Sequence, residues 1–274
     1  MENWMELQER TRNIRKNIVR MVTAAKSGHP GGSLSAVEIL TAIYFTQMNI
    51  DKTNIDDVKR DKFVLSKGHA SPVLYAVLAE KGLVEEDLMT FRQIDSPFQG
   101  HPSMRMLKGV DMSTGSLGQG ISAAVGMALS NQVHGDPYRV YALLGDGECE
   151  EGQVWEAAMA AAHYHLDNLL VFVDHNGLQI DGEVAKVMNP TPLDEKFKAF
   201  GWNVIVLEDG NDLKQVVDAC EAAKKVKHQP TVVIAKTVKG KGVSFMENQA
   251  GWHGVAPSAE QCEQALAELE GGEA

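Results

Sequence analysis

Two spacings of apolar residues alternate along most of the chain. In one, three to five apolar residues follow each other directly; in the other, they recur every three or four positions, as on one face of a helix. The first pattern predicts strands at 63–65, 140–144, 169–173, 203–207 and 231–235. The second predicts helices at 4–26, 35–48, from Pro72 onward, at about 118–133, 155–166 and 193–200, and two more that capping boxes open at Asp212 and Ser258.

Strands that are apolar along their whole length must be covered on both faces, and helices between them provide that cover. The expected fold class is therefore α/β: a doubly wound, mostly parallel sheet with helices on both faces. No linker rich in Pro, Gly or Ser divides the chain, so residues 1–274 are expected to form a single domain with a short C-terminal helical tail.

Two neighbouring predicted strands end in oxygen-bearing side chains. Asp146 follows one strand and Asn176 follows the next. One crossover separates them, so both are expected at the same sheet edge, where such folds bind ligands. Carboxylate, amide and carbonyl oxygens suit Mg²⁺. Gly145 and Gly147 flank the aspartate and would let a diphosphate approach the backbone closely. Alone, Gly-Asp-Gly is better explained as a tight turn; Asn176 is the second observation, and it shifts the balance to a metal site.

Four of the nine histidines stand beside Gly or Pro, which is typical of loops: His29, His69, His101 and His253. Histidine can accept and return protons near neutral pH. Any one of them taken singly could be structural. The other five lack this setting, and His163 with His165 has no third ligand at zinc spacing.

Two glycine-rich segments do not fit nucleotide-binding motifs. Residues 115–120 lack the dinucleotide spacing, and Lys239-Gly-Lys-Gly242 lacks the phosphate-loop spacing. Two interpretations of the second segment remain open: it orders over a bound cofactor, or it is a solvated basic turn.

Charge and composition exclude some function classes. The net charge of −11 disfavours nucleic acid and anionic membranes as partners. Three scattered cysteines do not make a disulfide framework, which indicates a cytoplasmic protein. We find no signal peptide and no stretch long enough to span a membrane.

Several motifs, in order, resemble the transketolase family over about residues 11–257. They are Ser27-Gly-His-Pro-Gly-Gly32, Leu65-Ser-Lys-Gly-His-Ala70, Gly100-His-Pro102, Ser113-Thr-Gly-Ser-Leu-Gly-Gln-Gly120, Gly145-Asp-Gly-Glu-Cys-Glu-Glu-Gly152, Asp174-His-Asn-Gly-Leu-Gln-Ile-Asp-Gly182, Lys236-Thr237 and Trp252-His-Gly254. One position departs: Ser116 stands where many transketolases carry proline.

The resemblance implies a thiamine-diphosphate-binding (PP-type) fold and a role for each matching residue. Asp146, Asn176 and the carbonyl of Leu178 would hold Mg²⁺, or Ca²⁺ or Mn²⁺. The diphosphate would contact His69, Gly147 and His253 beside Gly145, and Gly115 with Leu117 would line the rest of the cofactor. The reactive carbon and the sugar hydroxyls would be surrounded by His29, His69, His101 and His253. Glu151 would belong to a carboxylate relay across a subunit interface; alternatively, the acidic cluster 148–151 is a solvated surface.

Transketolases of this family carry two further domains, which this sequence lacks. The resemblance thus implies the N-terminal, diphosphate-binding half of a split enzyme, active only with a C-terminal subunit that supplies the pyrimidine-binding domain, as a heterotetramer with two of each chain. Its substrates would be sugar phosphates of the pentose phosphate pathway, between which a two-carbon ketol unit is transferred. Open alternatives are a subunit of another thiamine-diphosphate enzyme (deoxyxylulose-phosphate-synthase-like or 2-oxo-acid-dehydrogenase-like) and a non-catalytic cofactor-binding subunit.

Overall fold

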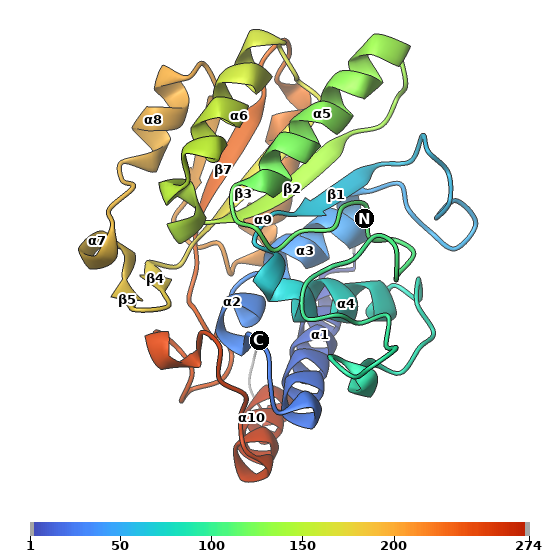
Figure 1. Cartoon of the computed structure of the whole chain (residues 1–274), viewed down its shortest axis with the longest axis vertical. Helices are drawn as coiled ribbons and strands as arrows, with labels where there is room; N and C mark the ends of the chain where they lie inside the picture. Colours follow the sequence, from blue (N-terminus) through green and yellow to red (C-terminus); the bar gives the residue numbers. More distant parts are fainter. Residues whose placement is uncertain (1–2, 272–274) are drawn as a thin grey trace.

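The computed structural model describes residues 3–271, and five parallel strands form its central sheet (Figure 1). The strand order is β1-β2-β3-β7-β6, and every neighbouring pair is parallel. This confirms the predicted fold class and the position of each predicted strand. The strands are β1 (Lys62–Leu65), β2 (Val140–Gly145), β3 (Leu169–His175), β6 (Asn203–Leu207) and β7 (Thr231–Lys236), beside a small antiparallel hairpin of β4 (Leu178–Gln179) and β5 (Gly182–Glu183).

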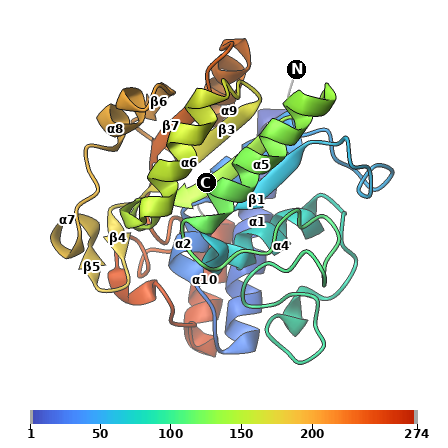
Figure 2. The same cartoon turned by 45° about the horizontal axis from the view of Figure 1, so that its top comes forward.

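Helices cover both faces of the sheet, as Figures 1 and 2 show. Successive side chains of a strand point to opposite faces: Tyr141 and Leu143 join one apolar core, whereas Val140 and Ala142 join the other. Each fully buried large side chain contributes about 1.5–3 kcal/mol. The first core lies against α1 (Trp4–Ala25), α3 (Val37–Ala42), α4 (Ser71–Glu80) and α9 (Leu213–Lys225); the second lies against α5 (Gln119–His134), α6 (Gly152–His163) and α8 (Leu193–Ala199).

The predicted helix at 35–48 is wrong in its extent. The chain forms two short pieces there, α3 and the π-helix η1 (Ile43–Gln47), and a further short helix, α2 (Pro30–Leu34), precedes them. Pro30 starts α2 because its fixed φ suits the first turn of a helix, so only residues 26–29 separate it from α1. Buried α2 presents its backbone to the site described below.

Helix α6 lies three residues earlier than predicted. It begins at Gly152, because the 3₁₀ turn η4 (Gly147–Glu150) delivers the chain directly to its N-terminus, and it stops before His165, whose φ of 55° is left-handed. The box at Ser258 is confirmed: Ser258 Oγ accepts from Gln261 N at 3.2 Å, and Gln261 Oε1 accepts from Ser258 N at 2.9 Å.

A long segment after β7 returns to the N-terminal helices. It includes the short turn η5 (Ala250–Trp252), which contacts α2, and it leads to α10 (Ala259–Gly271), which packs on α1 (Figure 1). The remaining short elements are η2 (Gly68–Ala70), η3 (Leu88–Thr90) and α7 (Val184–Val187). Among the helices described, none is long and apolar enough to cross a membrane.

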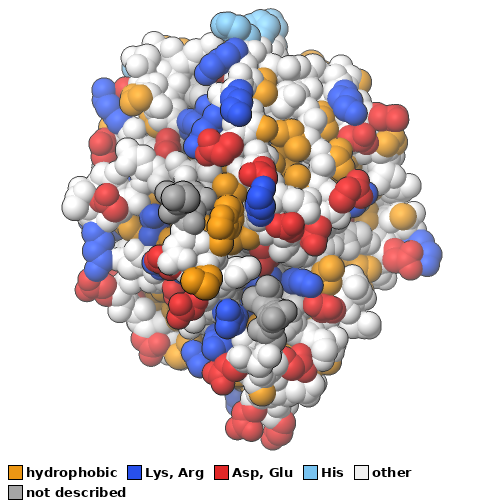
Figure 3. Space-filling model, turned by 180° about the vertical axis from the view of Figure 1, so that it is seen from behind, with side chains coloured by type: hydrophobic (Ala, Val, Ile, Leu, Met, Phe, Trp, Pro, Cys, Tyr) orange, Lys and Arg blue, Asp and Glu red, His pale blue; other side chains and the backbone are white. Residues whose placement is uncertain are grey.

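The side of the molecule that is turned away in Figure 1 carries a mixed surface. Acidic and basic side chains lie interspersed there among small apolar areas (Figure 3). A face that binds nucleic acid would instead gather its Lys and Arg into a patch or stripe.

Candidate cofactor-binding site

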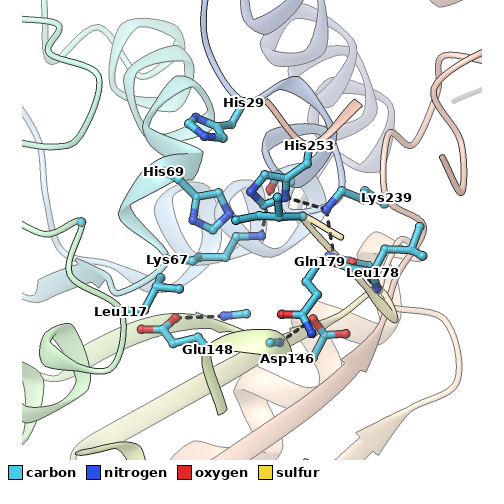
Figure 4. Close-up of a pocket in the computed structure, with 16 residues that line it drawn as sticks. His29, Lys67, His69, Leu117, Asp146, Glu148, Leu178, Gln179, Lys239 and His253 are labelled. Carbon is cyan, nitrogen blue, oxygen red and sulfur yellow. Dashed lines mark hydrogen bonds between the residues drawn. The ribbon is translucent and has the colours of Figure 1, made fainter. Parts of the chain in front are cut away.

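A cavity of about 210 Å³ opens at the carboxyl ends of the strands (Figure 4). Segments from both halves of the chain meet there. Ten of the predicted residues line it: His29, His69, Gly115, Leu117, Gly145, Asp146, Gly147, Asn176, Leu178 and His253. His101 and Glu151 do not line it.

The strand tips bring the predicted metal ligands together. Gly145 pairs with Asp174 across β2 and β3. The Asp146 carboxylate accepts the amide N–H of Gly147 at 2.8 Å and that of Gly177 at 2.6 Å, so it lies against the segment that carries Asn176 and the Leu178 carbonyl.

Burial, and next the nearby Asp174, raise the pKa of Asp146. A cation beside such a buried carboxylate would favour its charged form. Within residues 3–271 we find no cluster of three or more His, Cys, Asp or Glu side chains that could hold a metal. A metal at this corner would therefore depend on one carboxylate together with amide and carbonyl oxygens, a donor set that fits Mg²⁺.

A buried ion pair lies beneath this corner. Lys67, which follows β1, pairs with Asp174 at the end of β3, and their side chains are 2% and 0% exposed. Asp174 also accepts the hydroxyls of Ser35, at 2.6 Å, and Thr237. Burial alone would raise the pKa of Asp174, but the Lys67 ammonium and these hydrogen bonds outweigh it and lower the pKa. Asp174 therefore remains charged and anchors Lys67 at the cavity wall.

Lys239 enters the cavity from the segment after β7 (Figure 4). Its Nζ lies 3.2 Å from the Leu178 carbonyl oxygen and 3.0 Å from His253 Nδ1, and the residue is 1% exposed. Burial, and next the Lys67 charge, lower its pKa to about 8. The interpretation of this segment as a solvated basic turn is wrong for Lys239. The ammonium instead brings positive charge to the cavity beside the Leu178 carbonyl.

Three histidine rings face one another across the cavity. The ring centroids are 5.3 Å apart for His29 and His69, 5.3 Å for His29 and His253, and 5.1 Å for His69 and His253. Burial is the main cause that lowers the pKa of His29 to about 4, that of His253 to about 3, and that of His69 well below its usual value. All three rings are therefore uncharged near neutral pH.

His101 lies just outside this group, exposed, with its ring centroid 6.4 Å from that of His29. It packs on Gly115, which has a φ of 143°; a Cβ there would lie 2.9 Å from the His101 ring, so this position requires glycine. Glu151 is exposed at the N-terminus of α6.

Sequence reasoning missed Glu148, which is buried at the cavity wall. Its Oε1 accepts the Ser66 hydroxyl at 2.5 Å and the Gly118 amide at 2.9 Å, and its Oε2 accepts the Gly145 amide at 3.1 Å. Burial raises the pKa of Glu148. The acidic run 148–151 was the available signal, but nothing in it distinguishes Glu148 from its exposed neighbours. Lys67, Gln179 and Ile180 also line the cavity without having been predicted.

The fold and the site have counterparts among known proteins. Residues 7–270 match the family described as transketolase, thiamine diphosphate binding domain. The chain is 44% identical to the 6-deoxy-6-sulfo-D-fructose transketolase subunit SqwG of Clostridium sp. (strain MSTE9), over 98% of both chains. It is 42% identical to an apulose-4-phosphate transketolase subunit from Actinobacillus succinogenes, over 96% of both.

Full-length transketolases match over only part of their length. The structure of transketolase from Campylobacter jejuni superposes with a TM-score of 0.91 at 34% identity, over 98% of this chain and 43% of that one. For the Pichia stipitis enzyme the TM-score is 0.90 at 32% identity, over 96% of this chain and 40% of the Pichia chain. The chain thus spans about two fifths of the solved transketolases that it matches.

Proposed function

The chain belongs to the transketolase family as its thiamine-diphosphate-binding part, and from that premise we propose that it is the N-terminal subunit of a split transketolase. With a C-terminal subunit it would move a two-carbon ketol unit from a ketose phosphate to an aldose phosphate. The observation that carries this proposal is a single cavity with an oxygen-rich corner at one end and a cluster of uncharged histidines at the other.

The oxygen-rich corner suits a metal-bound diphosphate. Asp146, Asn176 and the Leu178 carbonyl would hold Mg²⁺, or Ca²⁺ or Mn²⁺. Lys239, His69, His253 and the backbone beside Gly145 and Gly147 would contact the diphosphate, because a buried ammonium and close backbone suit a buried anion. Gly115 and Leu117 would line the rest of the cofactor.

The histidine cluster suits the proton transfers of ketol chemistry. When bound, thiamine diphosphate supplies a nucleophilic carbon and an electron sink for carbon–carbon cleavage. His69 and His253 lie nearer the diphosphate end. His29 and His101 would face the sugar, where an uncharged imidazole can take a hydroxyl proton and return it.

The partner subunit would complete the site. The two relatives above are both named as subunits, which supports a two-chain enzyme. Ile180 at the cavity is 71% exposed, and Glu151 is exposed on α6, so both are accessible to a second chain. We propose that Glu151 joins a carboxylate relay to that chain, that the assembly is a heterotetramer with two of each chain, and that residues 1–274 act as one domain of a cytoplasmic enzyme.

The test is reconstitution. The chain is purified alone and together with the product of the neighbouring reading frame, and both are assayed with Mg²⁺, thiamine diphosphate and xylulose 5-phosphate with an aldose phosphate acceptor. We expect ketol transfer only from the two chains together, and no transfer when Mg²⁺ is chelated. Activity of this chain alone would refute the two-chain proposal.

The relatives widen the donor set for the same assay. Their names specify 6-deoxy-6-sulfo-D-fructose and apulose 4-phosphate. Both are ketoses with an anionic group at the far end, and each should be offered as donor beside xylulose 5-phosphate.

A further inference from the structure

Lys239 is fixed by groups that do not line the cavity. The backbone on one side of it is held by Asn211, whose Oδ1 accepts the Val238 amide at 2.8 Å. On the other side Arg15 of α1 donates from Nε to the Lys241 carbonyl at 3.1 Å. These two hydrogen bonds hold the backbone on both sides of Lys239, whose side chain reaches the Leu178 carbonyl.

Arg15 and Asn211, which make these two hydrogen bonds, both also bond to Glu38 of α3 and so belong to one network. Arg15 donates to Glu38 from Nη2 at 2.8 Å, and Asn211 donates to the same carboxylate from Nδ2 at 3.0 Å. Arg15 and Glu38 are 3% and 5% exposed. A buried, hydrogen-bonded ion pair tolerates little displacement, because a shift leaves its charges less well compensated.

The same network also reaches the second lysine of the cavity. Asn211 donates from Nδ2 to the Ser35 carbonyl at 3.0 Å, and the Ser35 hydroxyl donates to Asp174 at 2.6 Å. Asp174 in turn pairs with Lys67. Asn211 therefore stands between the anchors of Lys67 and Lys239, although it precedes α9 and has no place in the cavity wall.

We propose that Asn211, with Arg15 and Glu38, is a positioning residue of the cofactor site that fixes the Lys239 ammonium for the diphosphate. This inference rests on the proposed function, since it needs thiamine diphosphate as the ligand of the cavity. It adds residues from α1, from α3 and from the turn before α9, none of which lines the cavity.

The test compares Asn211→Ala with Asn13→Ala, a loss of the same side chain on α1, where Asn13 makes only a 3.4 Å contact with Glu80. Both variants are studied with the partner subunit. Hydrogen exchange of the amides of residues 238–241 and the Kd of thiamine diphosphate with Mg²⁺ are measured by mass spectrometry and calorimetry. We expect Asn211→Ala to speed exchange at these amides and to weaken binding about fivefold to tenfold, with Asn13→Ala unchanged.

Exchanging the hydrogen-bond donor and acceptor between Asn211 and Glu38 distinguishes a positioning role of Asn211 from a simple loss of packing. Asn211→Asp alone sets a second carboxylate against Glu38 and should bind the cofactor more weakly than Asn211→Ala. Adding Glu38→Gln restores one donor–acceptor pair, since the new amide can donate to the aspartate while its oxygen accepts from Arg15. The Ser35 carbonyl still lacks its donor, so the double variant should bind more tightly than Asn211→Asp but less tightly than the wild type.

Two negative results have different meanings. If the wild-type complex does not bind thiamine diphosphate, the proposed function and this inference both fail. If the wild type binds it and Asn211→Ala matches Asn13→Ala in exchange and in Kd, or the double variant binds no better than Asn211→Asp, only the positioning role is overturned.

Discussion

The ammonium of Lys239 donates to Nδ1 of His253 at 3.0 Å. An ammonium can donate a hydrogen bond but cannot accept one. Nδ1 of His253 must therefore be the unprotonated nitrogen, and the ring carries its hydrogen on Nε2. Burial, and next Lys239 itself, lower the pKa of His253 to about 3, which keeps the ring in this uncharged form. Lys239 therefore sets the tautomer of a histidine that faces two others, and it adds to the effect of burial in keeping that ring uncharged.

Replacing Lys239 should weaken cofactor binding. Lys239→Met keeps the length of the buried stem but removes the charge beside the Leu178 carbonyl and the cavity. We expect a loss of about tenfold to a hundredfold in thiamine diphosphate affinity, equivalent to one charge-assisted contact. Calorimetric titration of the assembled enzyme in the presence of Mg²⁺ measures it.

Lys241→Met is the matched control for that variant. Lys241 is half-buried outside the cavity, and its ammonium lies 3.8 Å from Glu247. The affinity of Lys241→Met for thiamine diphosphate should equal that of the wild type. Equal losses in both variants would mean that the net charge of the segment, and not the Lys239 contact, controls binding.

Asp146→Asn should separate metal binding from folding. The variant loses a charged ligand, and we expect Mn²⁺ affinity, followed by electron paramagnetic resonance, to fall about a hundredfold or more. Burial and Asp174 raise the pKa of Asp146, so removing its charge favours folding, whereas the asparagine NH₂ must face one of the two backbone amides that the carboxylate accepts. Because these two effects oppose each other, the thermal midpoint without metal should change little. Asp181→Asn, an exposed change in the hairpin, should keep wild-type Mn²⁺ affinity. A metal affinity of Asp146→Asn equal to that of the control would remove Asp146 from the ligand set.

Glu148→Gln should destabilise the fold. Both Glu148 oxygens accept hydrogen bonds, including two backbone amides, and a glutamine must turn its own NH₂ toward one of these donors. We expect the free energy of unfolding in urea to fall by about 1–3 kcal/mol. Glu151→Gln, on the exposed neighbour, should change it by less than about 0.5 kcal/mol. Equal effects would show that Glu148 is no better bonded than a surface carboxylate.

His101→Ala should distinguish an enzyme from a subunit that only holds the cofactor. His101 is exposed outside the cavity and beside His29. With the partner present, we expect kcat/KM to fall by about a hundredfold or more, as for loss of a proton-transfer group, with no change in thiamine diphosphate affinity. His134→Ala, at the far end of α5, is the control. Turnover equal to that of the control would assign His101 no role in the reaction.

Acid should destabilise the protein through His29. Burial, and next the Arg92 charge, lower its folded-state pKa from 6.5 to about 4. Between these values the unfolded chain binds a proton that the folded chain does not. The stabilising contribution is therefore complete above about pH 6.5 and is lost as the pH falls toward 4.

His29→Asn should show a shallower fall of the unfolding free energy between pH 7 and pH 5 than the wild type. The difference should be less than about 1.4 kcal/mol per pH unit, because the ring is partly open to solvent. Urea titrations at each pH measure it, and parallel curves for the two proteins would contradict the lowered pKa.

The strands and the meeting of Asp146 with the segment of Asn176 could be predicted because both follow from local rules. Apolar runs fix the sheet, and the ends of neighbouring parallel strands meet at one edge, which places Asp146 beside Asn176. The capping box at Ser258 could likewise be predicted, since its two partners are three residues apart.

Groups that depend on distant contacts could not be predicted. Lys239 lies in a sequence typical of a solvated turn, and only the return of its segment onto α2 buries it: the Gly240 amide donates to the Gly31 carbonyl at 3.0 Å. Lys67 and Asp174 are paired only because β1 and β3 flank β2. The three-part course of residues 30–47 was also hidden, because an apolar stretch shows no period where every side is buried.

The cavity is completed by a segment that is synthesised after every strand of the sheet. While a ribosome has released only the residues up to β7, the sheet, the Asp146–Asn176 corner and His29 can already exist, but Lys239 and His253 cannot yet reach them. Tight capture of an anionic ligand therefore requires the residues after β7, and a nascent chain that stalls there would lack both Lys239 and His253.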